Sequence, residues 1–469
     1  MTEHPTEDFS HNRVLTLKAP WEKSFDQILT PFERFVKRQA TAGLLLMFTA
    51  LAALIFANSA LGEHYRHMLH IPMGFTLGEW HIEKSVHHWI NDGLMTLFFF
   101  VVGLELKREV LVGELANLRM AILPIVAAIG GMVMPALIYV AINPSGDALR
   151  GWGIPMATDI AFALGVIALL AGRVPKSLIT FLVALAIVDD LGAIVIIALF
   201  YTEQLVWQAL ISAAVITSLM IMMNLIGVRR ASPYFILGFV LWIALMKSGV
   251  HATLAGVISA FTIPSLPRYE PKSFSLRMRE LLDKLDNSYV PGESILKNQK
   301  MAQTVSALYT GVVGVKTPLQ RLENTMHIPV AFLVLPLFSL FNAGVQIDFG
   351  NILGSLNQPV VIGVSFGLMF GKLFGIVGFS WIALRIGLVT LPPLVTIHHI
   401  LGAALLGSIG FTMSIFIAEL AFSHQPLLIE QAKLGILTTS VVAGFAGYFI
   451  LYKLGGEKRP LREHVKVSH

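Results

Sequence analysis

Residues 182–200 read LVALAIVDDLGAIVIIALF, an apolar run with two adjacent acids, Asp189 and Asp190, near its middle. The run is long enough to cross a membrane as a helix, which takes about 20 residues. Ionising a carboxylate at the centre of a bilayer costs at least about 2.5–3.5 kcal/mol. The two acids must therefore hold a cation, share a proton or pair with a buried base.

The composition of the whole chain indicates a membrane protein. Of its 469 residues, 55% are hydrophobic and 13% are charged, and the mean hydropathy is +0.71. Soluble globular proteins are far more polar. We expect an all-α polytopic membrane protein with about twelve transmembrane helices of about 20 residues each, near residues 41–61, 88–110, 120–141, 152–171, 177–201, 205–226, 233–248, 250–264, 328–346, 360–384, 398–422 and 431–452.

Basic residues predict the orientation, because Lys and Arg gather in cytoplasmic loops. With the amino terminus in the cytoplasm, most of the 34 Lys and Arg fall inside, many of them in the loop 265–327. This asymmetry explains the pI of 9.3 without a nucleic-acid partner. We expect a multi-pass bacterial inner-membrane protein with both termini cytoplasmic and no cleaved signal peptide. The absence of cysteine excludes disulfides, Fe–S clusters and thiol catalysis.

The predicted spans divide the chain into five segments. The first is a polar arm in which FDQILTPFERFVKRQ (25–39) has the spacing of an amphipathic surface helix or belongs to a frayed tail. The external loop 62–87 alternates like a β-hairpin, and the long internal loop has helical periodicity without the composition of a second domain. The segments are the cytoplasmic arm 1–40, helices one to eight in 41–264, the cytoplasmic loop 265–327, helices nine to twelve in 328–452 and the cytoplasmic tail 453–469.

Two spans carry helix breakers at mid-depth, in GIPMATDIAFALG (153–165) and LLGSIGFTMSIF (405–416). Irregular backbone at this depth is tolerated only where protein or a water-filled cavity satisfies it. Paired interrupted spans indicate the binding site of a transporter. Thr158 and Asp159 lie in the first break, where Asp159 either binds a cation directly or offsets the partial positive charge of a half-helix amino end.

Lys372, in FGLMFGKLFGIVGF (366–379), is the base at the centre of its span. A salt bridge from Lys372 to Asp189 or Asp190 lowers the cost of burying both charges. Neighbouring positions on a helix point about 100° apart, so we expect one acid to bind a cation and the other to assist. A cation would then compete with Lys372 for a carboxylate. The alternatives are a fixed bridge and a purely structural acid pair.

Titratable residues also gather near the ends of spans. Glu105, Arg108 and Glu109 share one helix face at the cytoplasmic end of a span, either as a solvated charge cluster or as a cation funnel that senses pH. His251 titrates near neutral pH or is structural. Glu419, near the outer end of its span, is expected to reach water by snorkelling.

These residues resemble the NhaA-type sodium/proton antiporter family. The resemblance covers about residues 30–265 and 320–455, and its motifs are long and in family order. The matching stretches are VVGLELKREV (101–110), AAIGGMVMPALIY (127–139), ATDIAFALGV (157–166), ALAIVDDLGAI (184–194), KSGVHATLAGV (247–257), LPLFSLFNAGV (335–345), GKLFGI (371–376) and IGFTMSIFIA (409–418).

The resemblance implies a fold of twelve helices with inverted-topology repeats and two interrupted, crossing helices. It implies a secondary transporter rather than an enzyme, with no catalytic residues and no cofactor. The expected activity is electrogenic, pH-regulated export of Na⁺ or Li⁺ in exchange for imported H⁺ by alternating access. It further implies a homodimer formed through the loop 62–87, in contact with membrane lipid.

The resemblance also implies roles for single residues. Asp190 matches the cation-binding aspartate, and Asp189 matches the partner that exchanges with the buried lysine, here Lys372. Thr158 and Asp159 match the pair at the crossing of the interrupted helices. Positions linked to pH sensing are Glu105, Arg108, Glu109, His251 and Glu323, and Asp92 matches an acid at the outer start of its helix.

The chain departs from the family pattern in several places, which leaves its pH profile open. About 50 residues are added within 265–320, and Asn324 stands where close relatives often have His. Ser408 and Glu419 replace smaller or uncharged residues.

Two other functions compete with this interpretation. An intramembrane aspartyl protease also uses buried acids, but it needs Tyr-Asp and Gly-x-Gly-Asp signatures that do not surround Asp159 or Asp189. A symporter of sodium with an organic solute needs a roomy polar pocket.

Overall fold

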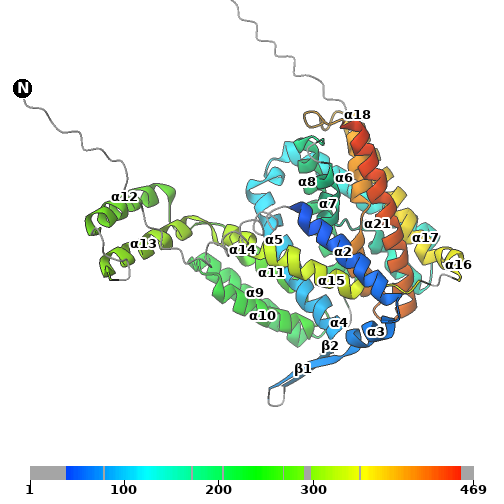
Figure 1. The fold of residues 1–469 in the computed structure, drawn as a ribbon, viewed down its shortest axis with the longest axis horizontal. Helices are drawn as coiled ribbons and strands as arrows, with labels where there is room; N and C mark the ends of the chain where they lie inside the picture. Colours follow the sequence, from blue (N-terminus) through cyan, green and yellow to red (C-terminus); the bar gives the residue numbers. More distant parts are fainter. Residues whose placement is uncertain are drawn as a thin grey trace, which may run out of the picture.

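The computed structural model describes residues 39–77, 80–170, 173–202, 205–267, 269–289, 297–347 and 350–455. The expected arm and most of the expected carboxyl-terminal tail lie outside these residues. Helices form most of the described chain, as the apolar composition predicts (Figure 1). The first elements are α2 (Gln39–Ala57), α3 (Gly62–His70), β1 (Pro72–Leu77), β2 (Trp80–Ser85), α4 (Val86–His88), η1 (Trp89–Leu94), α5 (Met95–Val112), η2 (Glu114–Ala116), α6 (Leu118–Ile142), η3 (Asp147–Met156) and α7 (Ile160–Leu169).

The remaining elements follow in the same helical pattern. They are α8 (Lys176–Phe200), α9 (Trp207–Ile226), α10 (Ser232–Met246), α11 (Leu254–Thr262), α12 (Pro271–Ser288), α13 (Gln299–Val315), α14 (Pro318–Pro329), η4 (Val330–Val334), α15 (Leu335–Asn342), α16 (Ile352–Leu356), α17 (Pro359–Phe366), η5 (Gly367–Gly371), α18 (Lys372–Arg385), α19 (Ile397–Gly407), α20 (Phe411–Ala421) and α21 (Pro426–Leu454).

Membrane-spanning candidates can be recognised by length and composition. Among the described residues, six single helices qualify, and three bent pairs raise the number to nine. The windows expected near 88–110, 233–248 and 250–264 are helical as well, but their helices are shorter or carry more charge. The protein is therefore a polytopic helical membrane protein, and the count of twelve stays a prediction.

Two of the bent pairs coincide with the predicted helix breakers. Asp147–Met156 and Ile160–Leu169 meet at 41°, and Ile397–Gly407 and Phe411–Ala421 meet at 47°. The third pair, Thr41–Ala57 and Gly62–His70, turns by 108° before the strands. The first two breaks expose backbone groups within spans, so each break needs partners from other elements.

Close packing of α6 against η5 and α18 positions Lys372 inside the bundle. A Cβ added at Gly371 would lie 2.5 Å from the Cα of Pro135 in α6, so this close packing admits only glycine there. The turn η5, a π-helical turn, ends directly before Lys372. Such turns inside α-helices are frequent at functional sites, and here the turn aims Lys372 into the protein, where it is fully buried.

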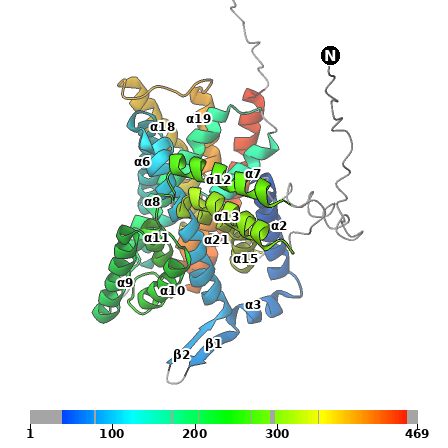
Figure 2. The same cartoon turned by 90° about the vertical axis from the view of Figure 1, so that its left-hand side faces the viewer.

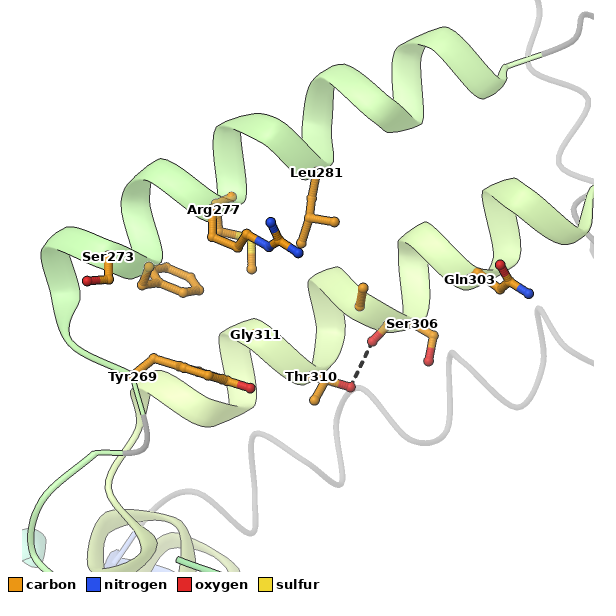
Figure 3. A pocket seen from close by; sticks show the side chains of 11 residues that line it. Tyr269, Ser273, Arg277, Leu281, Gln303, Ser306, Thr310 and Gly311 are labelled. Carbon is orange, nitrogen blue, oxygen red and sulfur yellow. Dashed lines mark hydrogen bonds between the residues drawn. The ribbon is translucent and has the colours of Figure 1, made fainter.

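Two features project from the helical bundle. The strands β1 and β2 pair antiparallel, which confirms the hairpin expected within the loop 62–87. The added loop forms α12 and α13, as its periodicity predicts, and these helices pack against each other beside the bundle (Figure 1). Figure 2 shows the β-hairpin at the opposite end of the vertical axis from the carboxyl-terminal end of α21. Residues of α12 and α13, among them Arg277 and Thr310, line a groove of about 760 Å³ (Figure 3).

Candidate functional site

Asp189 and Lys372 form an ion pair at the centre of the bundle. The Nζ of Lys372 lies 2.5 Å from the Oδ2 of Asp189, and neither side chain is exposed. Thr158 joins them: its hydroxyl accepts from the Nζ of Lys372 over 2.9 Å and lies 2.8 Å from Asp189 Oδ2. Helical spacing left open which acid pairs with the lysine and the family resemblance implied Asp189; in the structure the partner is Asp189. We call Thr158, Asp189, Asp190 and Lys372 the central cluster.

Asp190 has a different environment from Asp189. Its side chain is buried, yet its Oδ1 has no hydrogen-bond partner among the described residues. The Oδ1 of Asp189 is also buried without a partner. A buried carboxylate oxygen without a donor is costly, because it has lost water and gained nothing in exchange. These two oxygens are the atoms of the central cluster that a cation or a proton would satisfy.

Asp159 lies where the two broken spans meet. Its Oδ1 accepts from the N–H of Phe162 in the first turn of α7, and its Oδ2 accepts from the N–H of Thr412 in the first turn of α20. The hydroxyl of Thr412 also donates to Oδ2, over 2.5 Å. The carboxylate thus faces the amino ends of two helices, whose partial positive charge it offsets. This geometry supports the charge-compensating role over direct cation binding.

Backbone contacts join the two breaks to each other and to the central cluster. The N–H of Asp159 donates to the carbonyl of Ile409 over 2.7 Å. The hydroxyl of Thr158 lies 2.8 Å from the carbonyl of Gly407, the last residue of α19. Because Thr158 also contacts Asp189 and Lys372, a movement of either broken span would disturb the ion pair directly.

The predicted charge cluster at the end of α5 gathers residues from distant parts of the chain. Arg108 Nη1 lies 2.9 Å from Glu109 Oε1, and Arg108 Nε donates to Glu323 Oε1 over 2.9 Å. Glu105 lies within electrostatic reach of all three side chains and of Asp190. His251 lies just before α11, which packs against α5. We call Glu105, Arg108, Glu109 and Glu323 the Arg108 cluster, of which Glu105 is the member within electrostatic reach of Asp190.

Asp92 lies in η1, soon after the β-hairpin, and its Oδ2 is 2.9 Å from His88 Nε2. This placement at the start of its span agrees with the sequence. Ser408 and Asn324, two of the departures from the family pattern, do not contact the central cluster. The hydroxyl of Ser408 donates to the carbonyl of Ala404, and Asn324 is exposed.

The snorkelling expected for Glu419 is wrong. Its side chain is nearly buried and pairs with Lys433 of α21 over 2.6 Å, because the start of α21 brings a base against the end of α20. His87 Nε2 lies 3.7 Å from the same carboxylate and 3.0 Å from Asn342 Oδ1, and Asn342 donates to Asn91 over 2.8 Å. We call these five residues the outer cluster.

Sequence reasoning missed Lys433 and His87. A signal for Lys433 exists in EQAKLGILTT (430–439), where a lone base enters an apolar run that starts close after Glu419. His87 lies between a polar loop and an apolar run, so its sequence position carries no comparable signal.

Within the described part of the chain, no group of three or more His, Asp or Glu side chains is arranged to hold a metal ion. The central cluster offers instead two carboxylate oxygens, a hydroxyl and a backbone carbonyl. Oxygen ligands of this kind suit a hard cation.

Comparison with known proteins gives one consistent family. Residues 33–451 match the family model described as Na+/H+ antiporter 1. A Na(+)/H(+) antiporter NhaA 1 from Saccharophagus degradans is 63% identical over 438 residues, covering 93% of this chain and 94% of that protein. Proteins named Na(+)/H(+) antiporter NhaA from Syntrophobacter fumaroxidans and Sulfurimonas denitrificans are 49% and 48% identical, covering 97% and 93% of this chain and 97% and 98% of their own lengths.

Proposed function

The chain belongs to the Na+/H+ antiporter 1 family, and on this premise we propose that it exports Na⁺, or Li⁺, in exchange for H⁺ across a bacterial inner membrane. The observation that carries the proposal is the buried Asp190 carboxylate, whose Oδ1 has no partner among the described residues. It lies beside an acid–base pair and close to two broken spans. Relatives named as Na(+)/H(+) antiporters support the choice of ions.

Asp190 is the primary cation ligand in this proposal. Both the cation and the proton satisfy its buried oxygen, so the two compete for one atom and cannot occupy it together. Asp189 contributes its unpartnered Oδ1 to the same cation. The hydroxyl of Thr158, held between Asp189 and Gly407, supplies a neutral oxygen to the coordination.

Lys372 links cation binding to proton release. A cation at the two carboxylates weakens the hold of Asp189 on the Nζ of Lys372, since both positive charges compete for one carboxylate. The positive charge that enters this buried cluster is balanced when protons leave Asp190 and the Lys372–Asp189 pair. Loss of more than one proton for each cation makes the exchange electrogenic.

In alternating access, the cation-loaded central cluster is then opened to one side of the membrane and afterwards to the other. The bends of 41° and 47° are the places where the two spans can change shape. The Arg108 cluster, together with His251, adjusts the exchange to cytoplasmic pH through Glu105, which lies within electrostatic reach of both Arg108 and Asp190. The β1–β2 hairpin joins two copies into a homodimer.

The geometry favours antiport over proteolysis. An aspartyl protease needs two carboxylates that share one proton across a water molecule. Asp159 instead accepts three hydrogen bonds, from Phe162 and Thr412, and these hold it to the amino ends of α7 and α20. It is thus fixed in a structural position and is not free to share a proton with Asp189.

The test is Asp190→Asn, which keeps the shape and removes the charge. In everted membrane vesicles, we expect Na⁺-dependent dissipation of ΔpH to fall at least about 100-fold, because a ligand of the transported ion is lost. Asp283→Asn, the same change on the exposed side of α12, should leave exchange intact. Normal exchange by Asp190→Asn, with equal protein in the membrane, would contradict the assignment.

A further inference from the structure

Helix α20 connects the outer cluster to the middle of the bundle. Thr412, Phe416 and Glu419 follow one another at helical spacing and therefore share one face of this helix. Thr412, in the first turn, binds Asp159, and Glu419, near the last turn, binds Lys433. Because α20 is continuous, a change of its direction at the 47° break before it would displace both ends of this face together. The outer cluster is thus joined to one of the two broken spans through a single helix.

A layer of aromatic rings lies on the inner side of the outer cluster. The ring of Phe416 packs against Phe99 of α5 and Phe338 of α15, with ring centroids 5.4 Å and 6.3 Å apart, and all three rings are buried. Along α20, Phe416 comes before Glu419, and along α15, Phe338 comes one turn before Asn342. The contact of α20 with α5 and α15 is thus closed by the rings and, further out, by the outer cluster.

Within the outer cluster, His87 connects α20 to two other elements. Its Nε2 lies 3.0 Å from Asn342 Oδ1 in α15, 3.3 Å from Asn91 Nδ2 in η1 and 3.7 Å from Glu419 Oε1 in α20. The amide of Asn342 donates to Asn91 and to the carbonyl of Phe338, so its Oδ1 is left to accept from the ring. This arrangement favours the neutral ring with its proton on Nε2, and a second proton would bind Nδ1. The side chain is 23% exposed, so water reaches the ring.

A proton on His87 would add an unbalanced positive charge to the outer cluster. Glu419 is the acid of this cluster, and Lys433 already neutralises it over 2.6 Å, closer than His87 at 3.7 Å. Burial lowers the pKa of His87 from its ordinary value of 6.5; the attraction of Glu419 opposes this shift, and repulsion by Lys433 adds to it. The charged or titratable groups around the ring are Glu419 on α20, Lys433 on α21 and His70 at the end of α3, while His88 and Asp92 beside it pair with each other. Because a buried charge without a partner is costly, protonation of His87 works against the closed contact.

We propose that His87 is a proton-operated latch on the outer side of the protein: its neutral ring holds α20 against α15 and η1, and a proton from outside releases α20 and opens the central cluster to that side. Because the pKa of His87 is lower in the closed contact than in water, the closed contact loses stability as the outer pH falls below about 6.5. Histidine is the side chain that ordinarily changes its charge in this range. The latch rests on the proposed exchange and on the predicted orientation of the chain. It gives the imported proton a second role, as the signal that opens the outer side.

The chain contains no cysteine, so single introduced thiols can report whether the outer side is open. Ser339→Cys places a thiol beside Phe338 in α15, where the native serine is 1% exposed and its hydroxyl has no partner among the described residues. Ser59→Cys, at an exposed position just after α2, provides the reference. Right-side-out membrane vesicles are treated with a thiol reagent that does not cross membranes, at outer pH values between about 5 and 8 and at one inner pH. The ratio of the two labelling rates removes the direct effect of pH on thiol reactivity.

We expect the labelling rate of Ser339→Cys relative to Ser59→Cys to rise several-fold as the outer pH falls below about 6.5. With His87→Gln, whose amide stays neutral, this ratio should stay low at every pH. With His87→Arg, which keeps a positive charge, it should stay high at every pH. The matched control is His88→Gln, because His88 pairs with Asp92 instead, and here the ratio should rise as it does with the native histidines.

A ratio that does not change with outer pH, or that rises equally with His87→Gln, would overturn the latch. A rise that His88→Gln abolishes as fully as His87→Gln would overturn the assignment to His87. Na⁺-dependent exchange is measured in parallel and separates the two proposals. Exchange by Ser339→Cys without a pH-dependent ratio contradicts the latch alone, whereas absence of exchange by the native chain contradicts the proposed function.

Discussion

The central and outer clusters both bury an acid against a lysine, yet only one of them has the features of a transport site. In the outer cluster, Glu419 pairs with Lys433 and His87, and no atom of these residues is a buried group without a partner. In the central cluster, Asp189 and Asp190 each keep one such oxygen. A buried ion pair is thus common to both clusters, and what distinguishes the proposed transport site is its unsatisfied oxygens beside broken helices.

The two clusters also differ in their position relative to the helix breaks. Glu419 lies near the end of α20, away from the break that precedes this helix, and Lys433 lies within the unbroken helix α21. Thr158 of the central cluster lies between η3 and α7, within one break, and contacts the end of α19 at the other. The outer cluster therefore lies outside the two breaks, whereas Thr158 of the central cluster lies within one break and contacts the other.

The largest expected difference in stability concerns the outer cluster. Glu419→Gln leaves Lys433 buried without its charge partner, which costs about 3–5 kcal/mol. Thermal unfolding in detergent should detect a clearly lower midpoint. The pair Glu419→Gln/Lys433→Met removes both charges and should recover most of the loss. Exchange by the double variant in vesicles should remain, since neither residue binds the ion. A double variant that folds but does not exchange would place the outer cluster in the transport site.

The next effect is on the pH dependence of the central cluster. In Lys372→His, an imidazole with an ordinary pKa of about 6.5 replaces an amine of about 10.4. The base then keeps its proton only at lower pH, so the pH range of exchange should move toward acid, or the charge moved in each cycle should fall. Proteoliposomes assayed across pH, with and without an imposed potential, measure both. An unchanged profile and unchanged charge movement would indicate a fixed bridge.

The smallest effect is expected at Ser408, which lies in a break but bonds to the carbonyl of Ala404 in its own helix. Ser408→Ala should change the free energy of unfolding by about 0.5–1.5 kcal/mol and leave the apparent Na⁺ affinity unchanged. A large change in affinity would extend the binding site to the second broken span.

The central site was largely predictable from the sequence because burying a charge is so costly. Asp189, Asp190 and Lys372 stand out as charges inside apolar runs, and the glycines and proline near Thr158 mark a break. Helical periodicity alone did not predict the pairing, because which acid faces Lys372 depends on how α8 packs against α18; only the family resemblance implied Asp189. The outer cluster was missed for the same reason, because Glu419 and Lys433 become partners only through the turn between α20 and α21.

In the fold as well, elements that depend on local sequence patterns were predicted, and contacts between distant residues were not. The β-hairpin and the helices α12 and α13 agree with periodicities of the loops that form them. By contrast, the ion pair of Arg108 with Glu323 joins residues more than 200 positions apart, and spacing on α5 alone gave Glu105, Arg108 and Glu109 without Glu323. The sequence gives Asp159 two candidate roles and does not show its contacts with the amino ends of α7 and α20, which depend on how the two breaks pack together.

The most direct test of the central claim is Na⁺ binding itself, measured by calorimetry on purified protein. We predict that the native chain and the Glu419→Gln/Lys433→Met variant bind Na⁺ with similar affinity, and that Asp190→Asn gives no detectable binding. Retained binding by folded Asp190→Asn, or its loss only in the outer-cluster variant, would contradict the account.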